Sequence, residues 1–422
     1  MSKVNIIFEK RYKTIVYTMV FFLLWAFFQF HITGFNNLFT NLLGGYFFLV
    51  LEALVMITVG VQFISHPSSF NTKYLTYAIV FLFAYVLLSF TPLLNGCGAY
   101  IKIFIFPVII SALFICLRVD LKVIILDKYI RIVSYILALS VVEYILYQVT
   151  GIGIILFNQN DYNGINYTQL LFNYIETDSL VPRFRSLTIE PGNIGTACGL
   201  LLFAASNSKR YRFQYIVFWI SGIISFSLAF YALAAIHLIS LRTKGIPFLA
   251  LVAGALFILS IQFTDLYQVF IIGRLEDKSL EEIDNRSHVD IDNLLTNSWN
   301  DGTIWFGKGN YVYSGRYDGT FANGIRGHIY SYGIISVSWV IFVYLLIYLS
   351  EIRACRLRKG DLFSALLFLV AFFVSYYQRE YIFMIDFVAP FVTMPYFIRY
   401  KSALQSHKVV EWLVINKQEN NI

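Results

Sequence analysis

Three ionisable residues that could act on a phosphorylated substrate lie close together, just ahead of an apolar segment. The stretch RFRSLTIEPGNIG contains Arg183, Arg185 and Glu190, and LLFAAS follows a few residues later. Arginine makes planar, bidentate contacts with phosphate, and a carboxylate can orient or deprotonate a hydroxyl. The spacing fits a site that binds an anionic substrate and transfers a group to an alcohol. A simpler interpretation stays open, in which Glu190 caps the helix that follows and pairs with Arg185.

A histidine and several further arginines extend this chemistry. Arg326 and His328 open the apolar segment IRGHIYSYGIISVSWVIF, and a histidine can serve as a general acid or base near neutral pH. Arg274 and Arg286 lie in the polar stretch before it, and Arg379 lies in the short polar turn QRE. For each arginine the alternative is a solvated charge paired with a nearby acid, and for His328 it is an interfacial ring bonded to backbone.

The composition indicates which elements must hold these residues. Of the 422 residues, 58% are hydrophobic and only 14% are charged, whereas about 25% are charged in a typical soluble domain. Apolar runs of ~18 residues or more, each long enough to cross a bilayer, recur from end to end. The first, TIVYTMVFFLLWAFFQF, exceeds the ~7–15 residues of a signal-peptide core, so we expect a retained transmembrane helix. The expected fold class is an all-α polytopic membrane protein.

The hydropathy pattern predicts about twelve transmembrane helices in a single integral membrane domain that covers residues 1–422. Two of the predicted spans, the seventh and the eighth, are short. The residues GIISFSLAF, where one follows the other, are compatible with a sharp break. The expected spans are 15–33, 42–64, 74–94, 99–117, 130–149, 187–206, 212–226, 227–241, 246–264, 327–349, 362–378 and 382–398.

The distribution of basic residues predicts the orientation of these helices. With the N-terminus placed in the cytoplasm, 22 of the 32 lysines and arginines fall in the inner connections, which are short and basic, and 10 fall outside. This matches the excess of Lys and Arg in cytoplasmic loops, so both termini are expected to be cytoplasmic. The net charge of +7 then reflects membrane orientation, and we expect no nucleic-acid partner.

This orientation leaves two large outer loops, residues 150–186 and 265–326. Loops of this length are usually functional or disordered. Within the second, SLEE at 279–282 matches a capping box, and apolar residues then recur at roughly helical spacing. We therefore expect an amphipathic helix near 279–295 that lies on the membrane or covers a cavity. The candidate arginines of these loops oppose the usual charge rule, which makes them informative.

Three stretches resemble conserved elements of the bacterial O-antigen polymerase family. RFRSLTIEPGNIG resembles the segment from arginine to Glu-Pro that opens a transmembrane helix in that family. Arg286 followed by WFGKGN at 305–310 resembles the arginine and later G-x-G element of the second outer loop. RGHIYSYG resembles the His-to-Gly entry into the next helix, which the O-antigen ligases share. The resemblance covers most of the chain, including the number of spans and the order of these elements.

The resemblance implies a GT-C-like, metal-independent glycosyltransferase without a cofactor. Such an enzyme joins oligosaccharide repeat units carried on undecaprenyl pyrophosphate at the outer face of the bacterial cytoplasmic (inner) membrane. Its partners are these lipid-linked oligosaccharides, membrane lipid and, by the same resemblance, a chain-length-regulating membrane protein. Preorganised cations can stabilise a pyrophosphate leaving group without a metal. The catalytic candidates are Arg185, Glu190, Arg286, Arg326 and His328, and the substrate-binding candidates are Arg183, Arg274, Arg379, Tyr311 and Tyr313.

Other interpretations stay open at this stage. An O-antigen ligase would share the outer arginines, and a flippase or other transporter for lipid-linked oligosaccharides would have a similar length. The pair Asp290 and Asp292 has a metal-binding pattern, but it falls in an outer helix without a nucleotide-binding fold, so we expect no metal there. Glu52, Glu143 and Asp386 fall within expected spans, where ionisable groups are costly, and they could line a polar cavity or bond to neighbouring helices.

Overall fold

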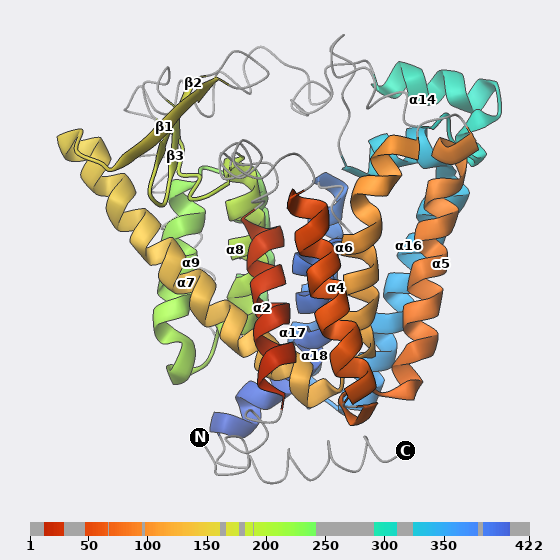
Figure 1. The fold of residues 1–422 in the computed structure, drawn as a ribbon, viewed down its shortest axis with the longest axis horizontal. Helices are drawn as coiled ribbons and strands as arrows, with labels where there is room; N and C mark the ends of the chain where they lie inside the picture. The colour runs from red at the N-terminus through yellow and green to blue at the C-terminus, as the bar shows by residue number, and fades with distance from the viewer. Residues whose placement is uncertain are drawn as a thin grey trace.

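The structure, a computed structural model, is mostly helical (Figure 1). It describes residues 12–28, 47–65, 67–94, 98–160, 166–176, 182–188, 190–241, 291–309, 324–378 and 383–405. The long helices are α2 (Lys13–Phe27), α4 (Phe47–Ser65), α5 (Thr72–Leu94), α6 (Gly98–Cys116), α7 (Val119–Thr150), α8 (Pro191–Ala205), α9 (Arg212–Ile224), α10 (Leu228–Ser240), α16 (Gly324–Cys355), α17 (Lys359–Gln378) and α18 (Ile385–Gln405). The shorter ones are η1 (Pro67–Ser69), η2 (Lys209–Tyr211), α14 (Ile291–Asn300) and η4 (Thr303–Trp305).

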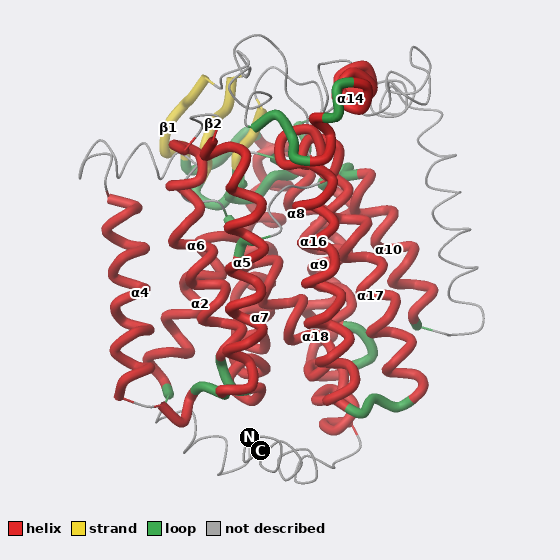
Figure 2. Tube along the Cα trace, turned by 90° about the vertical axis from the view of Figure 1, so that its right-hand side faces the viewer, coloured by secondary structure: helices red, strands yellow, loops and turns green. Residues whose placement is uncertain are grey.

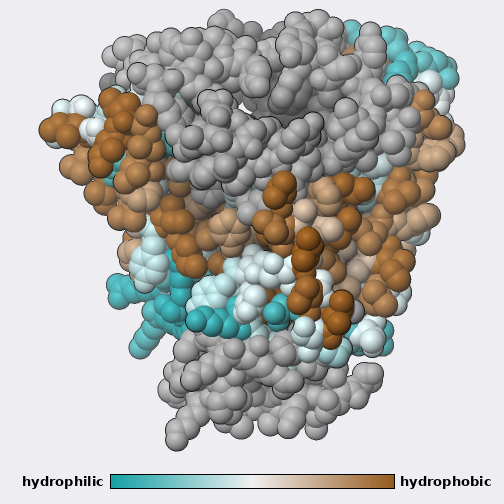
Figure 3. All heavy atoms as spheres, viewed as in Figure 1, coloured by the Kyte–Doolittle hydropathy of each residue, from teal (hydrophilic) through white to brown (hydrophobic). Residues whose placement is uncertain are grey.

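The helices form a bundle whose side surface is apolar (Figure 3). In α5, for example, Leu75, Ile79, Phe83, Val86 and Phe90 are all exposed and share one side of the helix. The other side of α5 is buried in the bundle, so the helix is apolar all round, as a membrane span is. By length and composition, four described helices, α5, α7, α16 and α17, could cross a membrane.

Most of the expected spans coincide with helices in the described residues. The third, 74–94, and the eleventh, 362–378, match α5 and α17 to within three residues. The fifth, 130–149, begins too late, because α7 starts at Val119 with a charged stretch that hydropathy alone does not include. The ninth, 246–264, lies outside the described residues. The total of twelve spans stays a prediction.

Aromatic rings fill the centre of the bundle. Tyr344 of α16, Phe372 of α17 and Phe391 of α18 pack together, with ring centroids 4.2–5.4 Å apart. All three are buried, with exposed fractions of 2% or less. Such close aromatic packing fixes the three C-terminal helices as one unit.

Helices α9 and α10 form a hairpin that turns at residues 225–227. Gly195 and Gly199 of α8 lie against Ser227 and Leu233, so α10 runs alongside α8 in the same direction. Each hairpin helix has only 13 residues, a length of about 20 Å, which is shorter than the ~30 Å of a bilayer core. The break expected in GIISFSLAF is therefore present, and the tip of the hairpin lies within the bundle.

The segment predicted as the first outer loop, residues 150–186, contains a β-sheet that an all-α prediction misses. Strands β1 (Ile155–Asn160), β2 (Asn166–Leu170) and β3 (Tyr174–Glu176) form an antiparallel sheet in the order β1-β2-β3. The sheet and α14 lie at the same end of the bundle in both views (Figures 1 and 2). We call this end the sheet end. Of the amphipathic helix predicted near 279–295, only residues 291–295 are described; they begin α14, which continues to Asn300, and the predicted start at 279 stays a prediction.

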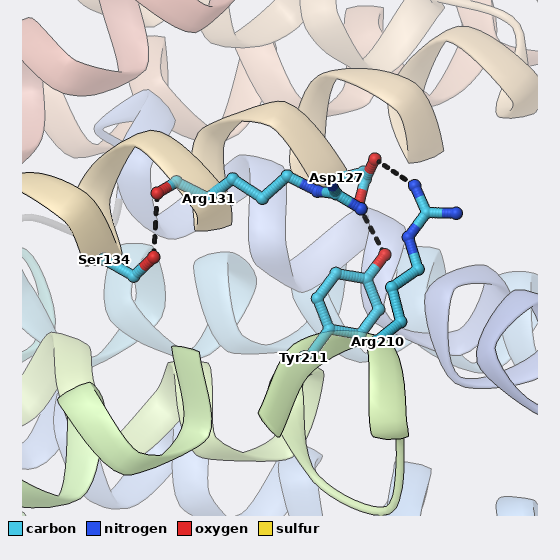
Figure 4. A network of polar contacts seen from close by, with 5 residues as sticks. All are labelled: Asp127, Arg131, Ser134, Arg210 and Tyr211. Carbon is cyan, nitrogen blue, oxygen red and sulfur yellow. Dashed lines mark hydrogen bonds and ion pairs between the residues drawn. The ribbon is translucent and has the colours of Figure 1, made fainter. Parts of the chain in front are cut away.

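Ion pairs hold the opposite end of the bundle together (Figure 4). Asp127 of α7 accepts hydrogen bonds from Arg131 at 3.1 Å, from Arg210 at 3.0 Å and from the hydroxyl of Tyr211. Arg210 and Tyr211 belong to η2, the turn between α8 and α9. The Asp127 carboxylate therefore anchors η2 to α7. This contact fixes the directions of α8 and α9 where they meet η2.

Candidate functional site

The segment that carries Arg183 and Arg185 is an irregular stretch held inside the bundle. The hydroxyl of Tyr144 on α7 donates to the carbonyl of Pro182 at 2.6 Å. Phe184 is fully buried and packs edge-on against the ring of Tyr144, with centroids 5.5 Å apart. The amide of Tyr174 in β3 donates to the carbonyl of Ser186 at 2.9 Å. Backbone without helical hydrogen bonds is tolerated here because other protein groups supply hydrogen-bond partners for its N–H and C=O groups.

Arg183 donates to the backbone at the tip of the α9–α10 hairpin. Its Nε lies 3.1 Å from the carbonyl oxygen of Ser225, and its Nη2 lies 2.9 Å from that of Phe226. Carbonyls at a helix end have no partner within the helix, and Phe226 has a left-handed φ of 48°. In the structure the guanidinium thus supports the hairpin, while its expected contact with substrate stays a prediction.

Arg185 lies on one face of the β-sheet. Its Nη1 donates to the hydroxyl of Tyr167 at 3.1 Å, its Nη2 forms an ion pair with Glu176, and its guanidinium carbon lies 4.8 Å from the centre of the Tyr167 ring. Tyr167 and Glu176 are directly paired across β2 and β3, so their side chains share a face. Arg185 is 7% exposed, and the sheet fixes the position of this cation.

Glu190 occupies the residue before the first turn of α8, with Pro191 at the first helical position. Its backbone carbonyl accepts from the amide of Asn193 and from the hydroxyl of Thr188, both at 3.1 Å. Its side chain does not cap the helix by a hydrogen bond. Glu176, which the sequence did not suggest, forms an ion pair with Arg185, and Glu190 is partly exposed.

Arg326 and His328 lie in the first turn of α16 at the sheet end. His328 is 3% exposed, its Nδ1 lies 3.1 Å from the hydroxyl of Tyr376 on α17, and its ring lies 5.2 Å from that of Tyr332. The sequence left open a bond from His328 to the backbone. In the structure the ring instead has the hydroxyl of Tyr376 as a hydrogen-bond partner. Helix α17, which carries Tyr376, contacts both α8 and α16.

The G-x-G element packs directly against α16 just beyond His328. Gly333 interrupts α16 with a φ of 83° and a ψ of 158°, and this conformation is essentially restricted to glycine. The amides of Lys308 and Gly309 donate to the carbonyls of Tyr330 and Ser331 at 2.9 and 2.8 Å. Gly307 approaches so closely that a Cβ there would lie 2.5 Å from the Ser331 oxygen. The sequence element therefore has a structural basis, which is a close backbone contact.

Glu143 holds the sheet on α7. Its carboxylate accepts from the amide of Leu171 at 3.0 Å, from the amide of Phe172 at 2.8 Å and from the side chain of Asn173 at 2.9 Å. Of the two interpretations left open for this acid, bonding to neighbouring elements describes the structure. A carboxylate suits this place because the β2–β3 turn presents several N–H groups in one direction.

Several predicted residues lie outside the described part of the chain. They are Arg274, Arg286, Tyr311, Tyr313 and Arg379. The contacts of Tyr167 and Glu176 with Arg185 were not predicted, because only the pairing of β2 with β3 brings them to the arginine. Among the described residues, no group of three or more His, Cys, Asp or Glu side chains is arranged to hold a metal.

Comparison with known proteins adds nothing to this geometry. No protein-family model matches the chain, and no curated protein matches it. What the protein does is therefore inferred from its own residues. At the sheet end, they combine a positioned guanidinium, a partly exposed carboxylate at a helix start and a buried histidine–tyrosine pair.

Proposed function

We propose that this protein is a surface-polysaccharide polymerase of the O-antigen type. It would transfer a growing glycan from undecaprenyl pyrophosphate to a hydroxyl of an incoming lipid-linked repeat unit, at the outer face of the bacterial cytoplasmic membrane. Both termini would then be cytoplasmic, and the sheet end would face outward. The observation that supports this most is that Arg185 contacts the β-sheet, Glu190 precedes α8, and Arg326 and His328 lie near the start of α16, which contacts α14.

The chemistry assigns a role to each group. Breaking the bond between the anomeric carbon and the pyrophosphate leaves negative charge on phosphate oxygens, which arginines stabilise when they are held in place beforehand. Arg185 is held by the sheet, and Arg326 lies at the start of α16. The acceptor hydroxyl must lose its proton to Glu190 or to His328. Direct displacement would invert the anomeric configuration.

The test is complementation of a deletion strain, read as the ladder of surface polysaccharide on a gel. The proposal expects the deletion to leave one repeat unit, and Arg185→Ala, Glu190→Gln and His328→Ala to reproduce that pattern at normal protein levels. Arg212→Ala is the matched control, because Arg212 is an exposed arginine at the opposite end. It should restore the full ladder.

Two outcomes would favour other functions. Complete loss of surface glycan with long chains still assembled on the lipid carrier would indicate a ligase. Accumulation of single lipid-linked units on the cytoplasmic side would indicate a flippase. If all of the site variants restored the full ladder, the assignment of the site would be wrong.

A further inference from the structure

Two tryptophans form an exposed aromatic surface at the sheet end. Trp299 at the end of α14 is 60% exposed, and Trp305 in η4 is 47% exposed. Their ring centroids lie 5.9 Å apart, with the planes tilted by 38°. Phe306, the next residue, is 66% exposed. We call Trp299 and Trp305 the tryptophan pair.

Packing of α14 does not account for the tryptophan pair. The apolar residues Leu294 and Leu295 already attach α14 to the bundle, because they pack against Tyr330 of α16. Trp299, one turn beyond Leu295, nevertheless remains 60% exposed. A tryptophan buries ~150–250 Å² when it packs, so leaving two of them exposed side by side has a cost that binding a ligand would recover.

Lipid does not fit the surroundings of the pair. Asn297, Asn300 and Asp301 are exposed in the same part of the chain, and Figure 3 shows a hydrophilic surface where α14 lies. Moving such amide and carboxylate groups into hydrocarbon would carry a large desolvation cost. The lipid-facing side of α5, by contrast, carries aliphatic and aromatic residues in an unbroken row. The pair therefore favours a ligand that has both apolar faces and polar edges.

The pair is held on a rigid turn. Asp301 accepts from the backbone amide of Thr303 at 2.9 Å, from its hydroxyl at 2.5 Å and from Lys308 at 2.8 Å. The hydrogen bonds from Lys308 and Thr303 lower the pKa of Asp301 to about 2. The residues that follow the pair are fixed to α16, because Gly307 lies close to Ser331 and the amides of Lys308 and Gly309 donate to carbonyls of that helix. A surface that is ordered in advance binds its ligand at a lower entropic cost.

We infer that the tryptophan pair is a carbohydrate-binding site that holds sugar rings of the glycan chain. The C–H face of a pyranose ring packs on an aromatic face, whose electron density is negative, and the hydroxyls at its edge can bond to amides and carboxylates such as those of residues 297–301. A ring cannot enter between the indoles, because two aromatic contacts of ~3.5–4 Å each would require about 7–8 Å. The glycan lies across their outer faces.

This inference rests on the proposed function only in placing a glycan at the sheet end. In a polymerase the site would hold the chain beyond the reacting end and so favour further additions. It would not touch the reacting atoms. Loss of the site should therefore shorten the chains without preventing the first linkage.

The test uses the full-length protein in detergent and the surface polysaccharide of its own strain, released from lipid by mild acid and separated by size. Binding is measured by calorimetry for the wild type, for the double variant Trp299→Ala/Trp305→Ala and for Trp299→Phe/Trp305→Phe. We expect the alanine variant to bind about tenfold or more weakly and the phenylalanine variant to retain most of the affinity. Trp219→Phe, a substitution in α9, is the control and should bind normally.

The outcomes separate this inference from the proposed function. Unchanged affinity in an alanine variant that elutes as a single species would overturn the inference, even if the deletion strain lost its polymer. Weakened binding would support it, even if the deletion strain kept a full ladder. Quenching of the tryptophan pair by brominated lipid in phosphatidylethanolamine–phosphatidylglycerol vesicles, measured as the quenching that Trp299→Phe/Trp305→Phe removes, would instead identify a membrane anchor and overturn the inference.

Discussion

Replacing Gly333 by alanine should release the G-x-G element from α16. An alanine Cβ at this position would lie 2.4 Å from the carbonyl oxygen of Trp305 and 2.5 Å from the carbonyl carbon of Phe306. Both are backbone atoms, which cannot move aside as the end of a side chain can. The φ of 83° and ψ of 158° add a strain of about 1–3 kcal/mol for any residue other than glycine.

The size of the effect follows from the contacts that would be lost. The hydrogen bonds from Lys308 and Gly309 to α16 contribute about 0.5–1.5 kcal/mol each. Together with the strain, the loss amounts to roughly 2–6 kcal/mol of local stability. Because 1.4 kcal/mol corresponds to a factor of ten, amide exchange at these two residues should accelerate by about 30-fold to 10⁴-fold.

Hydrogen exchange read by mass spectrometry on the purified protein measures this directly. Gly302→Ala is the matched control, because Gly302 has a φ of +73° but no atom within 4 Å of a Cβ placed there. It tests backbone strain without a collision. If Gly333→Ala and Gly302→Ala gave the same exchange across residues 305–309, the close backbone contact would not be what holds this segment.

Three further predictions concern the elements around the site. Glu143→Gln removes the charge that binds the β2–β3 turn, so proteolysis within residues 166–176 should become about tenfold faster, and an unchanged rate would mean that the sheet is held by other contacts. Arg183→Ala leaves two carbonyls at the hairpin tip without this donor, so the unfolding midpoint in detergent should fall by several degrees, with Arg183→Lys intermediate; loss of polymer at unchanged stability would instead place Arg183 on the substrate. Since the pKa of Asp301 is lowered to about 2, its bond with Lys308 contributes fully above the ordinary Asp value of ~3.9 and weakens only as pH falls towards 2. Glycan binding by the tryptophan pair should therefore be constant from pH 8 to 5, and a transition within that range would exclude this group as the titrating one.

Hydropathy located most of the bundle helices among the described residues, because these helices are predominantly apolar. It could not locate the strands at 155–176, since they are short and their polar residues look like those of any exposed loop. The start of α7 was missed for a related reason. Asp127 lowers the hydropathy of that stretch, yet in the folded chain it bonds to Arg131 and to Arg210 of η2.

The sequence predicted the types of residue in the site better than it predicted the contacts between them. The sequence placed Arg185 before a helix that begins at 187 and Glu190 a few residues inside it, whereas the helix, α8, begins at Pro191 and Glu190 directly precedes it. It left a pairing of the two open, whereas the structure pairs Arg185 with Glu176, which only the strand register explains. Arg183 was predicted as a substrate contact from its type alone, and its two carbonyl partners lie more than forty residues away in the chain. The G-x-G element was predicted from the family resemblance. The reason for glycine there, its close approach to Gly333, is visible only in the structure.

The most direct test of the central claim is the side of the membrane on which the sheet end lies. Single cysteines at Asn300 and at Lys209, both exposed and at opposite ends of the bundle, would be introduced into a cysteine-free protein and exposed to a membrane-impermeant maleimide in intact spheroplasts. We predict labelling at position 300 without permeabilisation, and labelling at position 209 only after it. The reverse pattern would place Arg185 and His328 in the cytoplasm, away from any substrate on the outer face.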